Sequence, residues 1–283
     1  MSKIYTRSFR VRWSEMDVTG QVSPANYLRY LVETAYDWGD ALGLNSNDYE
    51  KLGLFWLIRE TEINLLKPLR HNERFDFTIW MVNWQRVRGT RCFEIIKQDG
   101  GEIIAQGTQH IVSMDRASLR PTNMAEEILE NFRLENPRAF PYTRFPKISP
   151  APNAFKVKRQ VEWQDLDAQE HVNNAIFVTY AEEIAAQELL ACGWSPARLA
   201  EEDLALQTRR VHIQYLSPAV WGESLDVATH SLQLEPAGGS RFVGIQREDG
   251  SAVAECILDW KMIDRGTGQE RALPAELTQQ LRQ

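Results

Sequence analysis

Cysteine, histidine and long apolar stretches are all scarce in this sequence. Its three cysteines show no paired spacing, and its five histidines form no ligand pattern such as His-x3-His. No stretch approaches the roughly 18 apolar residues that a membrane span requires. We therefore expect no metal, no membrane-spanning helix and no membrane partner.

Positive charge is also in short supply. The 32 lysines and arginines face 39 aspartates and glutamates, which gives a net charge of −7, and the basic residues form no run. This balance disfavours nucleic acid and anionic lipid as partners, although a small basic mouth for a phosphorylated substrate stays compatible with it. The first residues lack an apolar run of signal-peptide length, so we expect a cytoplasmic protein.

What the sequence does contain is a repeat. Residues 15–33 align without a gap on residues 165–183 and place Asp17 over Asp167, a separation of 150 positions. The same separation relates Trp13 to Trp163, Gly43 to Gly193, Arg59 to Arg209, Ile63 to Ile213, Leu66 to Leu216, Pro68 to Pro218 and Glu73 to Glu223. Near the ends of the two copies the separation falls to 149, so we expect the second copy to lack one residue in the hairpin at Asp249. A repeat this long indicates duplicated domains rather than a solenoid.

The repeat and the length of 283 residues both predict two domains. Five prolines lie within residues 136–153, which is too many for a regular helix or strand. We therefore predict an N-terminal domain at residues 1–135, a proline-rich linker at 136–153 and a C-terminal domain at 154–283.

Each copy contains one long helical pattern and five strand-like stretches. Pro24 suits the first turn of a helix and Gly43 suits its left-handed end, so we predict a helix from 24 to about 42. The other predictions are strands at 8–13, 56–66, 74–84, 90–97 and 102–114, a short helix at 124–132, and in the second copy a first strand at 155–163 and a helix at 174–192. Strict alternation over residues 75–81 indicates an antiparallel sheet with one buried face. Such a sheet with one helix over its face is an α+β fold.

A polar loop precedes each long helix. The second loop, Asp167-Ala-Gln-Glu-His171, concentrates groups suited to acid–base chemistry and is followed by Asn173 and Asn174. Asp17 occupies the matching place in the first loop. An aspartate before a helix also has a purely structural interpretation as its N-cap, and the two asparagines can be caps as well. The residues alone leave capping and catalysis open.

The two loops resemble those of a known family. The pattern Trp-x3-Asp-x2-Gly-x-Val at residues 13–22, followed by Asn-Tyr-Leu and a helix, resembles the hot-dog-fold thioesterases of the 4-hydroxybenzoyl-CoA thioesterase type. The second loop, Asp-Leu-Asp-Ala-Gln-Glu-His-Val-Asn-Asn at residues 165–174, more closely resembles the catalytic half of the acyl carrier protein thioesterases, which are tandem hot dogs in one chain. The resemblance covers nearly all of both copies.

The resemblance implies two hot-dog domains, each a long helix wrapped by a five-stranded antiparallel sheet, paired as a pseudo-dimer with active sites at the seam. Further association into a homodimer stays open. It also implies that Asp17 and Asp167 match the catalytic carboxylate of the family and that His171 matches the histidine of the carrier-protein enzymes. The chain departs from that pattern at Gln169, where those enzymes have asparagine, and at residues 218–219, where plant members have a Glu-Cys pair.

The implied activity is hydrolysis of an acyl thioester of CoA or acyl carrier protein, without a cofactor. An aspartate would activate water or attack directly, and backbone amides around residues 20–21 or 170–171 would hold the thioester oxygen. The expected catalytic residues are Asp167, His171 and Asp17, and the expected substrate-binding residues are Gly20, Gln21, Gln169, Glu170, Asn173 and Asn174. Because the second loop has histidine where the first has Gln21, we expect Asp167 to carry the main activity. A hot-dog hydratase or dehydratase and a non-catalytic acyl-binding protein are the alternatives.

Overall fold

The computed structural model describes residues 3–282. The chain divides into two compact units, the N-terminal unit Met1–Thr143 and the C-terminal unit Arg144–Gln283. The boundary falls inside the proline-rich segment 136–153, and none of the residues of that segment, all described, is in a helix or strand.

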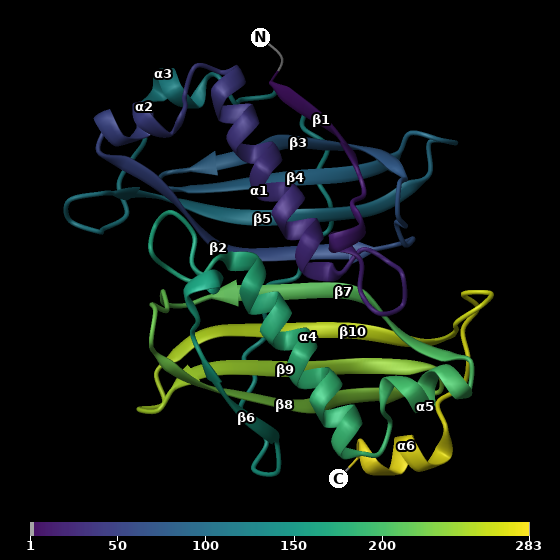
Figure 1. The fold of residues 1–283 in the computed structure, drawn as a ribbon. Coiled ribbons are helices and arrows are strands. Elements are labelled where there is room, and N and C mark those ends of the chain that lie inside the picture. The colour runs from purple at the N-terminus through teal and green to yellow at the C-terminus, as the bar shows by residue number, and fades with distance from the viewer. Residues whose placement is uncertain (1–2, 283) are drawn as a thin grey trace. The chain divides into compact units, whose positions relative to one another are not determined.

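The N-terminal unit is an antiparallel sheet with one long helix across it (Figure 1). Its elements are β1 (Ile4–Arg10), the short 3-10 helix η1 (Trp13–Glu15), α1 (Pro24–Ala41), α2 (Ser46–Lys51), β2 (Leu54–Leu65), β3 (Arg74–Gln85), β4 (Arg88–Lys97), β5 (Ile103–Asp115) and α3 (Glu126–Leu129). The five strands lie in the order β1-β3-β4-β5-β2, and every neighbouring pair is antiparallel.

The C-terminal unit repeats this plan. Its elements are β6 (Phe155–Gln160), η2 (Trp163–Asp165), α4 (Asn174–Ala191), α5 (Pro196–Glu201), β7 (Leu204–Tyr215), β8 (Ser224–Glu235), β9 (Gly238–Arg247), β10 (Ala252–Asp264) and α6 (Ala275–Gln280). Its five strands lie in the order β6-β8-β9-β10-β7, and every neighbouring pair is antiparallel. The α+β prediction of two tandem hot-dog domains is therefore confirmed.

The separation of 150 holds for both bounds of every element from η1 to β4, and it becomes 149 at β5. The hairpin before β5 explains the change. The Lys97 amide donates to the Glu102 carbonyl in the first unit, whereas the Arg247 amide donates to the Ser251 carbonyl in the second. The first hairpin therefore encloses residues 98–101 and the second only residues 248–250, as the sequence predicts.

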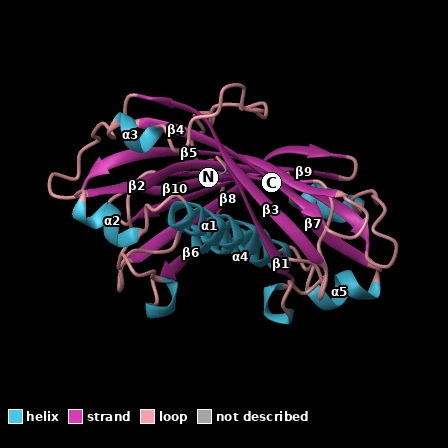
Figure 2. Ribbon diagram, turned by 90° about the horizontal axis from the view of Figure 1, so that it is seen from above, coloured by secondary structure: helices cyan, strands magenta, loops and turns pink. Residues whose placement is uncertain are grey.

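The sheet of the N-terminal unit buries one face against α1. Phe75, Phe77 and Ile79 alternate along β3 and are all 0% exposed. The ring of Tyr30, on α1, lies 4.9 Å from that of Phe75 between centroids, so this face of β3 is the one that the helix covers. Figures 1 and 2 show α1 lying along that face of its unit. Each such aromatic or aliphatic side chain contributes about 1.5–3 kcal/mol through burial.

The ends of the long helices agree with the sequence signals. Pro24 is the first residue of α1, and the helix ends before Gly43, whose φ is +74°. Gly193 has the same left-handed conformation after α4, with φ +78°. Only glycine adopts this conformation without steric cost, which is why the two glycines mark the helix ends.

The prediction of a first strand at 8–13 was wrong, because β1 begins at Ile4 and ends at Arg10. Arg10 pairs with Arg74, the first residue of β3, so the ladder has no partner to extend further. Trp13 instead starts η1 and is 74% exposed. The corresponding strand predicted at 155–163 likewise ends early, at Gln160.

The short helices were predicted poorly. Only Glu126–Leu129 is helical in the predicted helix at 124–132, and α2 was not predicted. The start of α2 depends on a local cap, since the Asn45 carboxamide accepts the amides of Asn47 and Asp48 at 2.9 and 3.2 Å. A helix of about one turn has no apolar periodicity for a sequence pattern to detect.

Candidate functional site

The loop after the 3-10 helix has the same hydrogen-bonded form in both units. The amide of Asp17 donates to the Gln21 carbonyl at 2.7 Å, and that of Asp167 donates to the His171 carbonyl at 3.0 Å. Isolated bridges between residues 16 and 22 and between residues 166 and 172 continue this pairing. Each aspartate therefore opens a five-residue turn, and His171 faces Asp167 across its turn.

The amide of the fourth residue closes each turn. The Gly20 amide donates to the Asp17 carbonyl at 3.1 Å, and the Glu170 amide donates to the Asp167 carbonyl at 2.9 Å. Both donors are thus engaged inside the turn. Of the amides expected to hold a thioester oxygen, that of Gln21 makes a long 3.3 Å bond to the Asp17 carboxylate, and that of His171 has no acceptor among residues 3–282.

The two aspartates differ in how their carboxylates are used. Asp17 is half-buried, and its Oδ1 accepts the Thr19 amide at 2.7 Å and the Thr19 hydroxyl at 2.6 Å in addition to the Gln21 amide. Asp167 is exposed, and its Oδ1 accepts only the Gln169 amide, at 2.9 Å, among the described residues. Asp167 therefore retains more free lone pairs than Asp17 for a water proton or a substrate carbon.

Neither aspartate caps a helix. The N-cap of α1 is Ser23 and that of α4 is Asn173, six residues beyond the respective aspartates. The Asn173 carboxamide accepts the Ala175 amide at 2.9 Å, as an N-cap side chain does. Asn174 is the first residue of α4, and its carbonyl accepts the Tyr215 hydroxyl at 3.1 Å. Capping thus accounts for Asn173 and leaves the two aspartates without that structural explanation.

Glu170 adopts a backbone conformation that is unusual for its residue type. Its φ is +62°, and the equivalent Gly20 has φ +76°. For a residue with a Cβ atom, the left-handed region costs roughly 1–2 kcal/mol. Strain of this kind is often found at functional sites. The turn that carries Asp167 therefore keeps its shape despite a residue that disfavours it.

A second loop supports the aspartate turn. The amide of Val172, next to His171, donates to the Ala219 carbonyl at 2.9 Å, and in the first unit the Val22 amide donates to the Leu69 carbonyl at the same distance. The supporting residues lie in the loop between β7 and β8, or between β2 and β3. The position of each aspartate turn thus depends on the conformation of this neighbouring loop.

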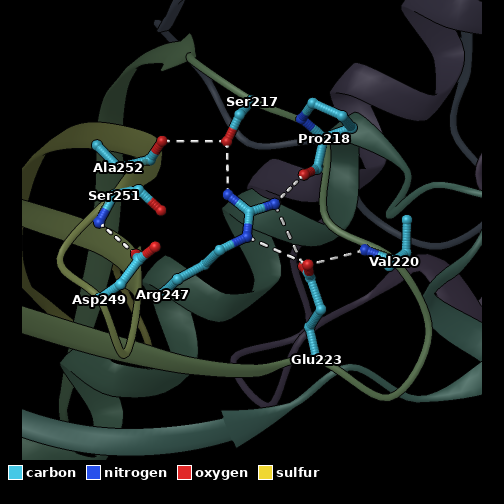
Figure 3. A network of polar contacts seen from close by, with 8 residues as sticks. All are labelled: Ser217, Pro218, Val220, Glu223, Arg247, Asp249, Ser251 and Ala252. Carbon is cyan, nitrogen blue, oxygen red and sulfur yellow. Dashed lines mark hydrogen bonds and ion pairs between the residues drawn. The ribbon is translucent and has the colours of Figure 1, made fainter.

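A half-buried ion pair fixes that loop in the C-terminal unit (Figure 3). The Arg247 guanidinium, on β9, donates to the Ser217 hydroxyl at 2.9 Å, to the Pro218 carbonyl at 2.5 Å and to the Glu223 carboxylate at 3.1 Å. The Glu223 carboxylate also accepts the Val220 amide at 3.2 Å. Arg247 therefore spans both ends of the loop that Val172 contacts.

The N-terminal unit uses a simpler form of this arrangement. Glu73 accepts the Lys97 ammonium at 2.6 Å and the Arg70 amide at 2.8 Å. The sequence repeat aligned Glu73 with Glu223, but the pattern gave no reason to assign them a role. The sequence did contain a signal for this ion pair, because both copies have a glutamate at the matching positions 73 and 223 and a cationic residue at 97 and 247.

Among residues 3–282, no three His, Cys, Asp or Glu side chains gather in a way that can hold a metal ion. Within the same described range, every helix is too short or too polar to cross a membrane.

Comparison with known proteins identifies the family. Residues 2–132 match the acyl-ACP thioesterase N-terminal domain, and residues 161–281 match the thioesterase-like superfamily. The oleoyl-acyl carrier protein thioesterase 2 of Arabidopsis thaliana is 23% identical over 203 residues, which cover 66% of this chain and 55% of that protein. The long-chain acyl-CoA thioesterase FadM of Escherichia coli is 29% identical over 126 residues, covering 44% of this chain and 94% of FadM.

A solved structure supports the fold over nearly the whole chain. The acyl-ACP thioesterase of Bacteroides thetaiotaomicron has a TM-score of 0.77 at 17% identity, with 92% of this chain and 100% of that chain covered. The chain spans about half the length of the Arabidopsis relative. With two thioesterase families matched in succession on a tandem hot-dog fold, the chain belongs to the hot-dog acyl thioesterases.

Proposed function

We propose that this protein hydrolyses acyl thioesters of CoA or of an acyl carrier protein to a free acid and a thiol, as a step in fatty acid metabolism and without a cofactor. The observation that carries the proposal is the aspartate turn before the long helix, which has the same backbone–backbone hydrogen bonds in both units of a hot-dog thioesterase. The two relatives named above, one acting on each kind of carrier, support both carriers as candidates.

Asp167 is the proposed general base or nucleophile. Its Oδ2 accepts no hydrogen bond and forms no ion pair with a described residue, so it can accept a proton from water or attack the thioester carbon. Asp17 is the secondary candidate because its Oδ1 already accepts three hydrogen bonds. His171, opposite Asp167 in the turn, would orient the water or share its proton.

The His171 amide is the proposed donor to the thioester oxygen. Negative charge develops on this oxygen when water or a carboxylate adds to the carbonyl carbon. One backbone donor aimed at that charge typically contributes about 2.7–4 kcal/mol to the transition state. The positive end of the α4 dipole lies beside this amide in the chain and acts in the same direction. Gln169, Glu170 and Asn174 are the proposed substrate contacts around the turn.

The test is a screen of thiol release from acyl-CoA and acyl carrier protein thioesters of increasing chain length. We expect turnover of at least one series. The absence of thiol release from every alkyl and aryl thioester on both carriers would reject the proposal. Hydration of an enoyl thioester without thiol release would favour the hydratase alternative.

A further inference from the structure

Arg91 is a buried cation in the interior of the N-terminal unit. It lies on β4 and pairs in register with Met81 of β3 and Gln109 of β5. Met81 continues the alternation of Phe75 on the face that α1 covers, so Arg91 points to the same side of the sheet. The arginine is only 5% exposed.

Its polar neighbours are neutral. The Nε and Nη2 atoms of Arg91 both donate to the carboxamide oxygen of Gln109, the first at 2.8 Å. The Gln109 amide donates in turn to the Thr61 hydroxyl at 2.9 Å. Among residues 3–282, no carboxylate forms an ion pair with Arg91, and its Nη1 has no acceptor. Burial lowers the pKa of Arg91 to about 10, opposed by the hydroxyls of Tyr49 and Tyr36.

The C-terminal unit shows how the fold neutralises an arginine at this point. Arg241 stands 150 positions after Arg91, is 2% exposed, and pairs with the Glu188 carboxylate at 2.8 Å. Glu188 belongs to α4, and the equivalent residue of α1 is Trp38. The counterparts of Gln109 and Thr61 are Leu258 and Val211. The C-terminal unit thus supplies Arg241 with an internal counter-ion in apolar surroundings. The N-terminal unit surrounds Arg91 with neutral polar groups and supplies no counter-ion among residues 3–282.

A charge buried without a counter-ion is costly, and such a charge is usually paired. The Nε and Nη2 atoms of Arg91 donate to Gln109, whereas Nη1, on the other edge of the guanidinium, has no acceptor among residues 3–282. Two parallel N–H groups on one edge of a guanidinium match the two oxygens of a carboxylate. The missing counter-ion at Arg91 is therefore best supplied by a carboxylate from outside the chain.

The surroundings select the rest of the ligand. Phe77, Phe93 and Ile63, which share this face with Arg91, are apolar and 0% exposed. Phosphate groups, with more charge and hydration, do not suit such a lining. Trp38, at the helix position equivalent to Glu188, is 14 residues beyond Pro24, roughly 21 Å along the axis. Arg91 thus lies toward the end of α1 that is remote from the Asp17 turn.

We propose that Arg91, with Gln109 and Tyr49, binds a carboxylate at the far end of an acyl group, so that the preferred substrates are thioesters of long dicarboxylic acids. This inference rests on the proposed function, because it names the substrate class of that reaction. It also explains the difference between the units, since an internal acid such as Glu188 would occupy the edge of the guanidinium that the ligand needs.

Binding is tested by calorimetry with thioether analogues, on CoA and on the carrier protein, which cannot be hydrolysed. Carboxyl-ended and methyl-ended analogues are compared at each of several chain lengths. We expect the carboxyl-ended analogue to bind at least about tenfold more tightly at one length or more, the scale of a charge-assisted hydrogen bond. Equal binding at every length, tighter binding of the methyl-ended analogue, or no binding of either would overturn the inference.

The decisive variant is Gln109→Glu, which keeps the shape of the side chain and gives Arg91 an internal carboxylate. We expect it to remove the preference for the carboxyl-ended analogue while changing affinity for the methyl-ended one less than about threefold. Arg91→Met should have the same effect. Gln85→Glu adds the same charge at an exposed position of β3 and should leave the preference intact.

An unchanged preference in Gln109→Glu would contradict the inference even if Arg91→Met fails to fold. The proposed function has a separate readout, because thiol release is measured with the corresponding thioesters. Hydrolysis with no carboxylate preference would leave the function standing and reject the site. Carboxylate-dependent binding with no hydrolysis would reject the function and leave the site standing.

Discussion

Tyr180 donates a hydrogen bond of 2.6 Å to the Asp165 carboxylate, and Tyr30 donates one of the same length to Glu15 in the other unit. Asp165 is only 3% exposed, and its carbonyl also accepts the Asn173 amide at 2.9 Å. The bond therefore joins the second turn of α4 to the residue that precedes the Asp167 turn by two positions. Both units hold the entry to this turn through a tyrosine on the long helix.

Tyr180→Phe should lower the free energy of unfolding by about 1.5–3 kcal/mol, because it leaves a buried carboxylate with one donor fewer. Urea denaturation measures the change. Tyr36→Phe is the matched control, since Tyr36 is exposed on α1 and should change stability by no more than about 0.5 kcal/mol. Equal effects of the two substitutions would show that the bond to Asp165 contributes nothing.

Asp167→Asn should lower kcat/KM for the best thioester by on the order of 10²-fold or more, the scale of a lost general base. The asparagine can still accept the Gln169 amide, so the turn should persist. Asp17→Asn is the matched control in the other repeat, and we expect a loss below about tenfold. Equal losses would indicate two working sites. Loss of all activity in Asp17→Asn alone would show that the catalytic turn lies in the N-terminal unit, contrary to the proposal.

Glu170→Gly should stabilise the protein by roughly 1 kcal/mol, because glycine adopts the left-handed φ of +62° without the steric cost that glutamate meets. Thermal and urea unfolding both report the gain. Gly20→Ala is the reciprocal change at the equivalent position. It should destabilise through the backbone alone, since an added Cβ at Gly20 meets no atom within 4 Å. A destabilising Glu170→Gly would show that the glutamate side chain makes a compensating contribution.

Stability should fall steeply in alkali. Burial raises the pKa of Tyr27, Tyr30, Tyr49, Tyr180 and Tyr215 above the ordinary 10.0. In the unfolded chain these phenols ionise near pH 10, whereas in the folded chain they stay protonated to higher pH. Their contribution is therefore complete below pH 10 and is lost as the pH rises through their folded pKa values. Unfolding free energies measured in urea from about pH 8 to 11 should show this fall.

Tyr49→Phe isolates one of these groups. No described hydrogen bond involves the Tyr49 hydroxyl, so the substitution should change stability little at neutral pH. Above pH 10 the variant should lose stability less steeply than the unchanged protein, because one fewer buried phenol must stay protonated. Parallel curves over the whole range would contradict the assignment of a raised pKa to Tyr49.

The sequence predicted those parts of the fold that depend on patterns within one stretch. Pro24 and Gly43 marked the long helix, and the alternation of Phe75, Phe77 and Ile79 marked the buried face of the sheet. The end of β1 was missed because it depends on where its partner begins, at Arg74. A strand pattern carries no information about the length of the neighbouring strand.

At the candidate site, the sequence located both aspartate turns. It did not show which hydrogen bonds their carboxylates and backbone amides make. The residues alone left open whether Asp17 and Asp167 cap the helices, and the structure shows that Ser23 and Asn173 are the N-caps. The isolation of Arg91 was also invisible, because it depends on the cross-strand register that places Gln109, and no acid, beside the guanidinium. Registers between strands are tertiary facts that no single stretch encodes.

Because the elements of the two units have matching bounds, a segment of one unit can replace the equivalent segment of the other without shifting the strand registers. From η1 to β4 every element has a counterpart displaced by the same 150 positions, and the displacement changes only at the hairpin of Asp99 and Asp249. A chimaera that exchanges whole segments up to β4 would keep the registers of the intervening ladders. A junction after that hairpin would need one residue added or removed. Exchange of the two aspartate turns alone would place His171 in the first unit with its backbone hydrogen bonds conserved.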